Sequence, residues 1–190
     1  MLSAEAQSQQ SPFNPHWALY PRSYVAQRTS VPLIDHIDGN LDKEVWSKIP
    51  WSELFDDIRG EADAPEDERP KSSCRTRFKV LWDDDHIYIG AILESDFTTE
   101  AHFTQRNSPI YHTDSDFEVF MDPSGECQYY KEFEMNAINT VWNLMLDKPY
   151  ADNGQEFSGR IAKPGDVNYY EVFNQKTASK VIKGNLNDPG

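Results

Sequence analysis

The stretch DSDFEVFMDPSGECQYYKEFEMNAINTVWNLML, residues 114–146, holds the densest run of strand signals in this chain. Phe117, Val119 and Met121 recur at every second position, which is the period expected for a half-buried strand. Residues 122–125, Asp-Pro-Ser-Gly, predict a turn, because proline fixes φ and glycine allows a positive φ. Two more strands are predicted over 129–137 and 140–146. The stretch therefore predicts a three-stranded meander.

The predicted meander has an apolar side and a polar side. Alternation in its second strand separates apolar residues from Glu134 and Asn136. Together with Glu118 of the first strand, these two residues are expected on the polar side. Trp142 shares a face of the third strand with two leucines, so we expect it in the core.

Strand signals also recur outside the meander. Residues 74–82 and 86–94 alternate and predict a hairpin around Asp83-Asp84-Asp85, which we interpret first as a turn and only second as metal ligands. A helix of one or two turns is predicted over 41–49. Trp46 and Trp82 are expected in the core. Three further short strands are predicted over 34–40, 168–173 and 177–184.

Short strands separated by turn signals indicate an all-β fold. We predict an antiparallel β-sandwich, jelly-roll-like with immunoglobulin-like layering, with one short helix near the N-terminus. Residues 1–30 are expected to form an irregular tail, whose aromatic part can dock on the domain, and residues 31–190 the domain.

The composition excludes several classes of partner. The 190 residues carry a net charge of −14, which argues against nucleic acid and anionic membrane surfaces and is compatible with neutral sugars or calcium. Cys74 and Cys127 can pair or remain thiols, and neither has metal-ligand spacing. No stretch approaches the ~20 apolar residues of a membrane-spanning helix. The N-terminus lacks signal-peptide features, which predicts an intracellular protein, or an extracellular one if the true N-terminus is missing.

Over residues 32–190 the chain resembles the family 9 carbohydrate-binding modules and related domains. Four motifs carry the resemblance in the same order: Ile37-Asp38-Gly39 followed by Trp46, Val80-Leu81-Trp82-Asp83-Asp84 leading into Ile87-Tyr88-Ile89-Gly90-Ala91, Phe117-Glu118-Val119-Phe120-Met121-Asp122-Pro123, and Phe133-Glu134-Met135-Asn136-Ala137.

The resemblance implies noncatalytic binding of a polysaccharide or of the end of a glycan chain. It also implies calcium ions that support loops, a neighbouring glycoside hydrolase domain, and strands beyond Gly190 that would complete the sandwich. By the same comparison, Glu118 matches a glutamate that binds sugar hydroxyls. The family's first stacking tryptophan falls at His112, with Tyr111 beside it. Asn136 is a candidate for a further polar contact, or it bonds a neighbouring loop.

One departure changes the chemistry expected at this site. Glu134 stands where the family has an arginine. It is expected to supply a further polar contact to the sugar or to be a solvated carboxylate, and in either case two carboxylates are expected to lie close together. Such a pair either shares a proton or holds a cation.

Three other functions stay open from the sequence. The domain can have kept the fold as an interaction module without sugar binding. Two glutamates about 5 to 10 Å apart can serve a glycosidase as acid and base, with Glu118, Glu132 and Glu134 as candidates. A haem site would need a Met/His axial pair, and Met121, Met135 and Met145 lie near the meander. The phase of Met121 and Met135, however, favours a core position for both.

Overall fold

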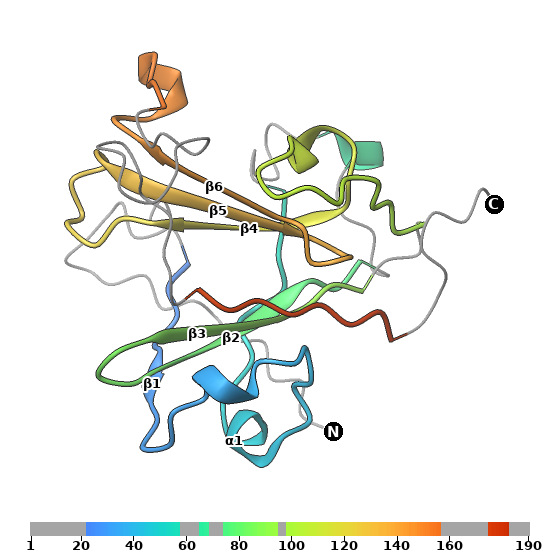
Figure 1. The fold of residues 1–190 in the computed structure, drawn as a ribbon, viewed down its shortest axis with the longest axis vertical. Coiled ribbons are helices and arrows are strands. Elements are labelled where there is room, and N and C mark those ends of the chain that lie inside the picture. The colour runs from blue at the N-terminus through green and yellow to red at the C-terminus, as the bar shows by residue number, and fades with distance from the viewer. Residues whose placement is uncertain (1–21, 58–64, 69–73, 95–97, 157–174, 183–190) are drawn as a thin grey trace, which may run out of the picture.

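The computed structural model describes residues 22–57, 65–68, 74–94, 98–156 and 175–182. Within these ranges the chain forms two three-stranded sheets and one short α-helix, and the sheets lie one above the other (Figure 1). This arrangement confirms the predicted all-β sandwich. Short 3-10 helices complete the described elements: η2 (Ile34–His36), η3 (Glu66–Glu68), η4 (Ile110–His112) and η5 (Tyr150–Asp152).

The first sheet is built on the predicted hairpin. Strands β2 (Arg77–Trp82) and β3 (Ile87–Ile92) pair antiparallel. The Asp83 carboxylate accepts hydrogen bonds from two backbone N–H groups of the connecting turn, so this aspartate acts as a turn former, as predicted. Strand β1 (Gln27–Arg28) adds to β2 in parallel, within the segment that the sequence assigns to a tail.

The second sheet is the predicted meander. Strands β4 (Asp116–Met121), β5 (Tyr130–Asn136) and β6 (Val141–Leu146) pair antiparallel in that order. The turn after β4 is tied by the Asp122 carboxylate, which accepts hydrogen bonds from the backbone N–H groups of Gly125 and Cys127. Gly125 has φ +69°, the left-handed conformation for which glycine was expected there.

The prediction for the two sides of the meander is wrong for its third strand. Glu118 pairs with Glu134, and Glu134 pairs with Trp142, so all three side chains point to the same side of the sheet. The tight turn between β5 and β6 sets this register, with Asn139 at φ +68°. Trp142 is nonetheless only 4% exposed, so its predicted core position is confirmed.

The buried apolar clusters lie on the sides of the two sheets that face away from each other. On the first sheet, Leu81 and Tyr88 pack against Trp46 of helix α1 (Glu44–Ser47). Trp46 is thus in the core, as expected. The other side of this sheet approaches the second sheet, because Phe55 contacts Phe78 on one side and Phe117 of β4 on the other. The cluster on the second sheet comprises Ile110, Trp142, Leu144 and Leu146.

Trp82 does not occupy the predicted core position, since it is 39% exposed. It is the last residue of β2, and it lies on the side of the sheet opposite Leu81, away from the buried cluster. The guanidinium of Arg28 lies 5.7 Å from its ring centroid and provides a cation–π contact in place of apolar packing.

Two of the other predicted strands are wrong. Residues 34–40 contain the 3-10 helix η2 rather than a strand. Residues 175–182 form no strand; they pass Gly39 so closely that a Cβ there would lie 3.2 Å from Lys180. The Ser179 hydroxyl donates a hydrogen bond to the carbonyl of Ala137. The strand predicted over 168–173 lies outside the described residues.

Cys74 and Cys127 remain thiols, and no disulfide joins them. Among the described residues, no helix has the length and apolar character needed to cross a membrane.

Candidate functional site

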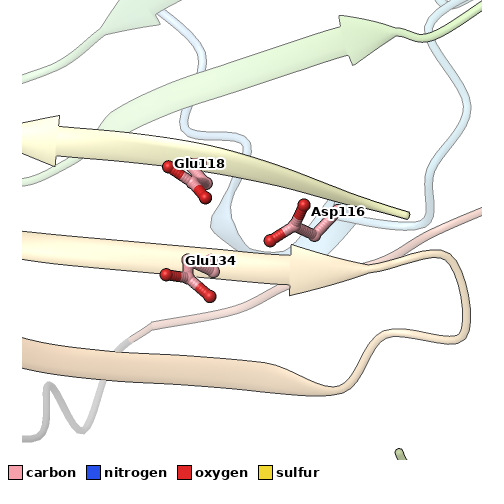
Figure 2. Close-up of side chains that lie close together, drawn as sticks. All are labelled: Asp116, Glu118 and Glu134. Atoms are coloured by element: carbon pink, nitrogen blue, oxygen red, sulfur yellow. The ribbon is translucent and has the colours of Figure 1, made fainter. Parts of the chain in front are cut away.

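Three carboxylates meet on one side of β4 and β5. Asp116 and Glu118 are two residues apart on β4, so their side chains share a face, and Glu118 lies opposite Glu134 of β5. One carboxylate oxygen from each residue lies within 4.8 Å of the other two. Figure 2 shows the three carboxyl groups gathered on one side of the two strands. We call these residues the carboxylate cluster, and this side of the sheet the carboxylate face.

Glu134 is the buried member of the cluster. It is 1% exposed, and its Oε2 atom has no hydrogen-bond partner. Burial, together with the neighbouring carboxyl groups of Glu132 and Glu118, raises the pKa of Glu134 to about 9. The side chain therefore holds a proton at neutral pH.

The other two members lie closer to solvent. Glu118 is exposed, and partial desolvation with the charges of Asp116 and Glu132 raises its pKa. Burial is also the main reason that the pKa of Asp116 is raised, and its Oδ2 atom is buried without a hydrogen-bond partner. In the parts of the chain that the structure describes, no lysine or arginine forms an ion pair with the cluster.

Exposed aromatic rings lie on the same face. Phe120 is opposite Glu132 in the ladder and is 53% exposed. The hydroxyl of Tyr150, in η5, donates a 3.0 Å hydrogen bond to Glu132, and its ring is also exposed. Burial of the hydroxyl and the charge of Glu132 raise the pKa of Tyr150, so this phenol stays protonated and keeps its donor.

The predicted stacking residues lie in η4, beside this sheet. The ring centroid of Tyr111 lies 4.9 Å from that of Trp142 in an edge-to-face arrangement, and 4.2 Å from that of His112. Trp142 is opposite Glu134, so the contact places Tyr111 on the carboxylate face. Tyr111 and His112 are both exposed. The structure thus brings Tyr111, His112 and Glu118 to one surface.

Asn136 and Glu134 are buried, whereas the other predicted site residues are exposed, so neither presents its side chain at the surface for direct sugar contact. Asn136 is 1% exposed, and its amide group donates hydrogen bonds to the carboxylate of Asp114 at 2.7 Å and the carbonyl of Phe103 at 3.0 Å. Its side-chain oxygen accepts hydrogen bonds from the backbone of the β5–β6 turn, including Thr140. Asn136 therefore connects the loop before η4 to the sheet, which is the alternative to direct sugar contact that the sequence left open.

Four residues of this face are not among the predicted site residues: Asp116, Phe120, Glu132 and Tyr150. The alternation that points Glu118 to this face also includes Asp116, so the first could have been found from the sequence. Glu132 shares the phase of Glu134, and the sequence offers it only as a candidate catalytic residue. No periodic signal places Tyr150, because it lies in the short 3-10 helix η5 after β6.

The geometry favours binding over hydrolysis. Glu118 and Glu134 have the proximity of a glycosidase acid and base, and the raised pKa of Glu134 suits an acid. Glu134, however, is 1% exposed, so it cannot reach the glycosidic oxygen of a substrate on the surface. Exposed carboxylate oxygens instead accept hydrogen bonds from hydroxyls or coordinate hard cations.

Comparison with known proteins gives one match. A family model described as "Carbohydrate family 9 binding domain-like" matches residues 37–168. Neither the curated proteins nor the solved structures contain a match. The matched range includes both sheets except β1, and all of the carboxylate face described above.

Proposed function

We propose that this chain, which belongs to the carbohydrate family 9 binding domain-like family, binds a polysaccharide or the end of a glycan chain on its carboxylate face without cleaving it. One observation carries the proposal. The exposed carboxylate of Glu118 shares a face with the exposed rings of Tyr111 and Tyr150.

These residue types match the two kinds of surface that a sugar presents. The C–H groups of a pyranose ring form an apolar patch that packs against a flat aromatic ring. The hydroxyl groups donate to a carboxylate, and such charge-assisted hydrogen bonds are stronger than neutral ones. The net charge of −14 and the cluster itself would repel acidic glycans, so we infer a neutral sugar.

Replacing Glu118 by alanine should weaken glycan binding. Loss of its charge-assisted hydrogen bonds should cost about 2 kcal/mol, or roughly 30-fold in Kd. Isothermal titration calorimetry with a glycan selected on an array measures the change. The matched control is Glu53→Ala, which removes an exposed carboxylate beside the first sheet and should leave affinity unchanged. An unchanged Kd for Glu118→Ala would remove this residue from the binding site.

Replacing Tyr111 by alanine should weaken binding about tenfold, because the ring that stacks on the sugar is lost. Tyr111→Phe keeps the ring and should keep most of the affinity. Since Tyr111 also packs on Trp142, near-ultraviolet circular dichroism must show that the alanine variant retains the native fold. Equal affinities for the alanine and phenylalanine variants would argue against stacking at this position.

Two assays separate the proposal from its alternatives. Failure to retain any glycan on the array, with and without calcium, would favour an interaction module that keeps the fold without sugar binding. Release of reducing ends from a bound glycan would show hydrolysis. Glu134→Gln should not change a release assay, because we expect no hydrolysis by either protein.

A further inference from the structure

The carboxylate cluster concentrates acidic groups without a compensating lysine or arginine from the part of the chain that the structure describes. Asp116, Glu118 and Glu134 offer oxygens within 4.8 Å of one another, and no described lysine or arginine forms an ion pair with them. Like charges at this separation repel, and the repulsion is stronger where water is excluded. Some other positive species is therefore needed if all three groups are to be ionised.

Two buried atoms at this site also lack partners. Glu134, which is 1% exposed, contacts the carboxyl group of Glu132, but no donor group of the protein is hydrogen-bonded to its Oε2 atom or to Oδ2 of Asp116, and both atoms are buried. Buried polar atoms are normally paired, so an unpaired oxygen facing other carboxylates indicates a missing partner. The carboxyl group of Glu134 lies on the same side of the strands as those of Glu118 and Asp116 (Figure 2).

We propose that the carboxylate cluster is a binding site for a hard divalent cation, with calcium as the best fit. Calcium takes oxygen ligands at about 2.3–2.6 Å, so two ligands on opposite sides of one ion are roughly 5 Å apart. The separations in the cluster are within this limit. Glu134 and Asp116 supply oxygens from the protein side, and Glu118 supplies one from the exposed edge.

The cation would keep open coordination positions toward solvent. Calcium takes six to eight ligands, and three carboxylates cannot fill these positions, so water occupies the rest. Vicinal sugar hydroxyls are neutral oxygen ligands, as water is, and can replace it at the cation. Only this last step, sugar coordination by the cation, rests on the proposed function; the cation site itself does not.

A second acidic segment of the chain shows why the cluster is distinctive. The Asp83 carboxylate, in the turn between β2 and β3, accepts hydrogen bonds from the Tyr88 hydroxyl and from two backbone N–H groups. Asp84 pairs with Arg28. These carboxylates accept hydrogen bonds from donor groups of the protein, whereas Oε2 of Glu134 and Oδ2 of Asp116 do not.

Calcium titration of the full chain, stripped with a chelator, tests the site without any glycan. Calorimetry should show one site, and terbium in place of calcium should give luminescence sensitised by Trp142, which is opposite Glu134. Glu134→Gln and Asp116→Asn should each raise the Kd for calcium more than about tenfold, because even the loss of an outer-shell partner costs roughly 10–100-fold. Asp84→Asn should change nothing.

Several results would overturn the proposal. No saturable binding at millimolar calcium is one, and a Kd unaffected by both cluster variants is another, because it would place the ion elsewhere. Calcium binding that survives while no glycan binds would reject the proposed function and keep the cation site. Glycan binding that is identical in chelator and in calcium, with no calcium bound, would reject the cation site and keep the proposed function.

Discussion

Glu134→Gln is expected to stabilise the protein at alkaline pH and to leave its stability at pH 5 nearly unchanged. The chelator-treated wild-type protein should lose free energy of unfolding as pH rises from 5 to 8, while the variant should lose less. The difference can reach about 4 kcal/mol at pH 8, which corresponds to one bound proton over three pH units. Urea unfolding at several pH values measures it.

The direction follows from the pKa of Glu134. In the unfolded chain this carboxyl group ionises near its ordinary pKa of 4.5, and in the folded protein near 9. Between these values the folded state binds one more proton than the unfolded state, so the free energy of unfolding falls as pH rises. The loss begins above the unfolded pKa and ends near the folded one. Glutamine has no proton to lose, and its amide can donate to a neighbouring carboxylate as the protonated acid does.

Within the described ranges, the groups that face Glu134 are acidic or neutral. They are Asp116, Glu118, Glu132, Trp142 and, through Glu132, Tyr150. Glu53→Gln removes an exposed carboxylate beside the first sheet and should keep the wild-type slope. Parallel pH profiles for the wild type and Glu134→Gln would mean that Glu134 is ionised in the folded protein.

The sequence predicts individual strands of the second sheet better than it predicts their relative phase. Alternation reports which residues of one strand share a side, so the three strands and the common phase of Glu134 and Asn136 were predictable. It does not report how strands pair. The pairing of Glu134 with Trp142 depends on the turn between β5 and β6, and a shift of one residue there would move Trp142 to the other side.

The candidate site was likewise only partly predictable from the sequence. Glu118, Tyr111 and His112 could be selected from the resemblance, and the structure brings them to one face. The resemblance does not predict how deeply each of these residues is buried. Glu134 and Glu118 are both glutamates and point to the same side of the sheet. Glu134 is nevertheless 1% exposed, whereas Glu118 is open to solvent. The apolar cluster that contains Trp142 lies beside Glu134 in the sheet. One of its members, Ile110, belongs to η4, which is far from β5 in the sequence.

Asp114→Ala is expected to destabilise the protein by about 3 kcal/mol or more and to weaken glycan binding as well. The Asp114 carboxylate accepts hydrogen bonds from the Asn136 amide at 2.7 Å and from the backbone N–H groups of His102 and Phe103. Alanine would leave these donors without their acceptor, at about 1–3 kcal/mol for each buried one. Thermal unfolding and calorimetry with the array-selected glycan measure the two effects.

The Asp114 carboxylate changes the free energy of unfolding with pH in the direction opposite to that of Glu134. Burial raises the pKa of Asp114, but hydrogen bonds from Asn136 and from the backbone of His102 and Phe103 outweigh burial and lower it overall. A lowered pKa means stability that is present above the unfolded value of 3.8 and is lost as pH falls through the folded one. The stability difference between Asp114→Ala and the wild type should therefore shrink in acid, whereas that for Glu134→Gln should grow in base.

Asp122→Ala separates a general loss of stability from an effect on the site. Asp122 also has a lowered pKa, chiefly from the Cys127 N–H, but it lies in the turn after β4, at the opposite end of that strand from Asp116. Its removal should leave glycan affinity unchanged. Asp114 acts differently, because it lies just after the C-cap of η4 and its hydrogen bonds hold the segment that carries Tyr111 against the sheet. If both variants bind glycan like the wild type, the position of Tyr111 does not depend on this network, and stacking must use another ring of the carboxylate face.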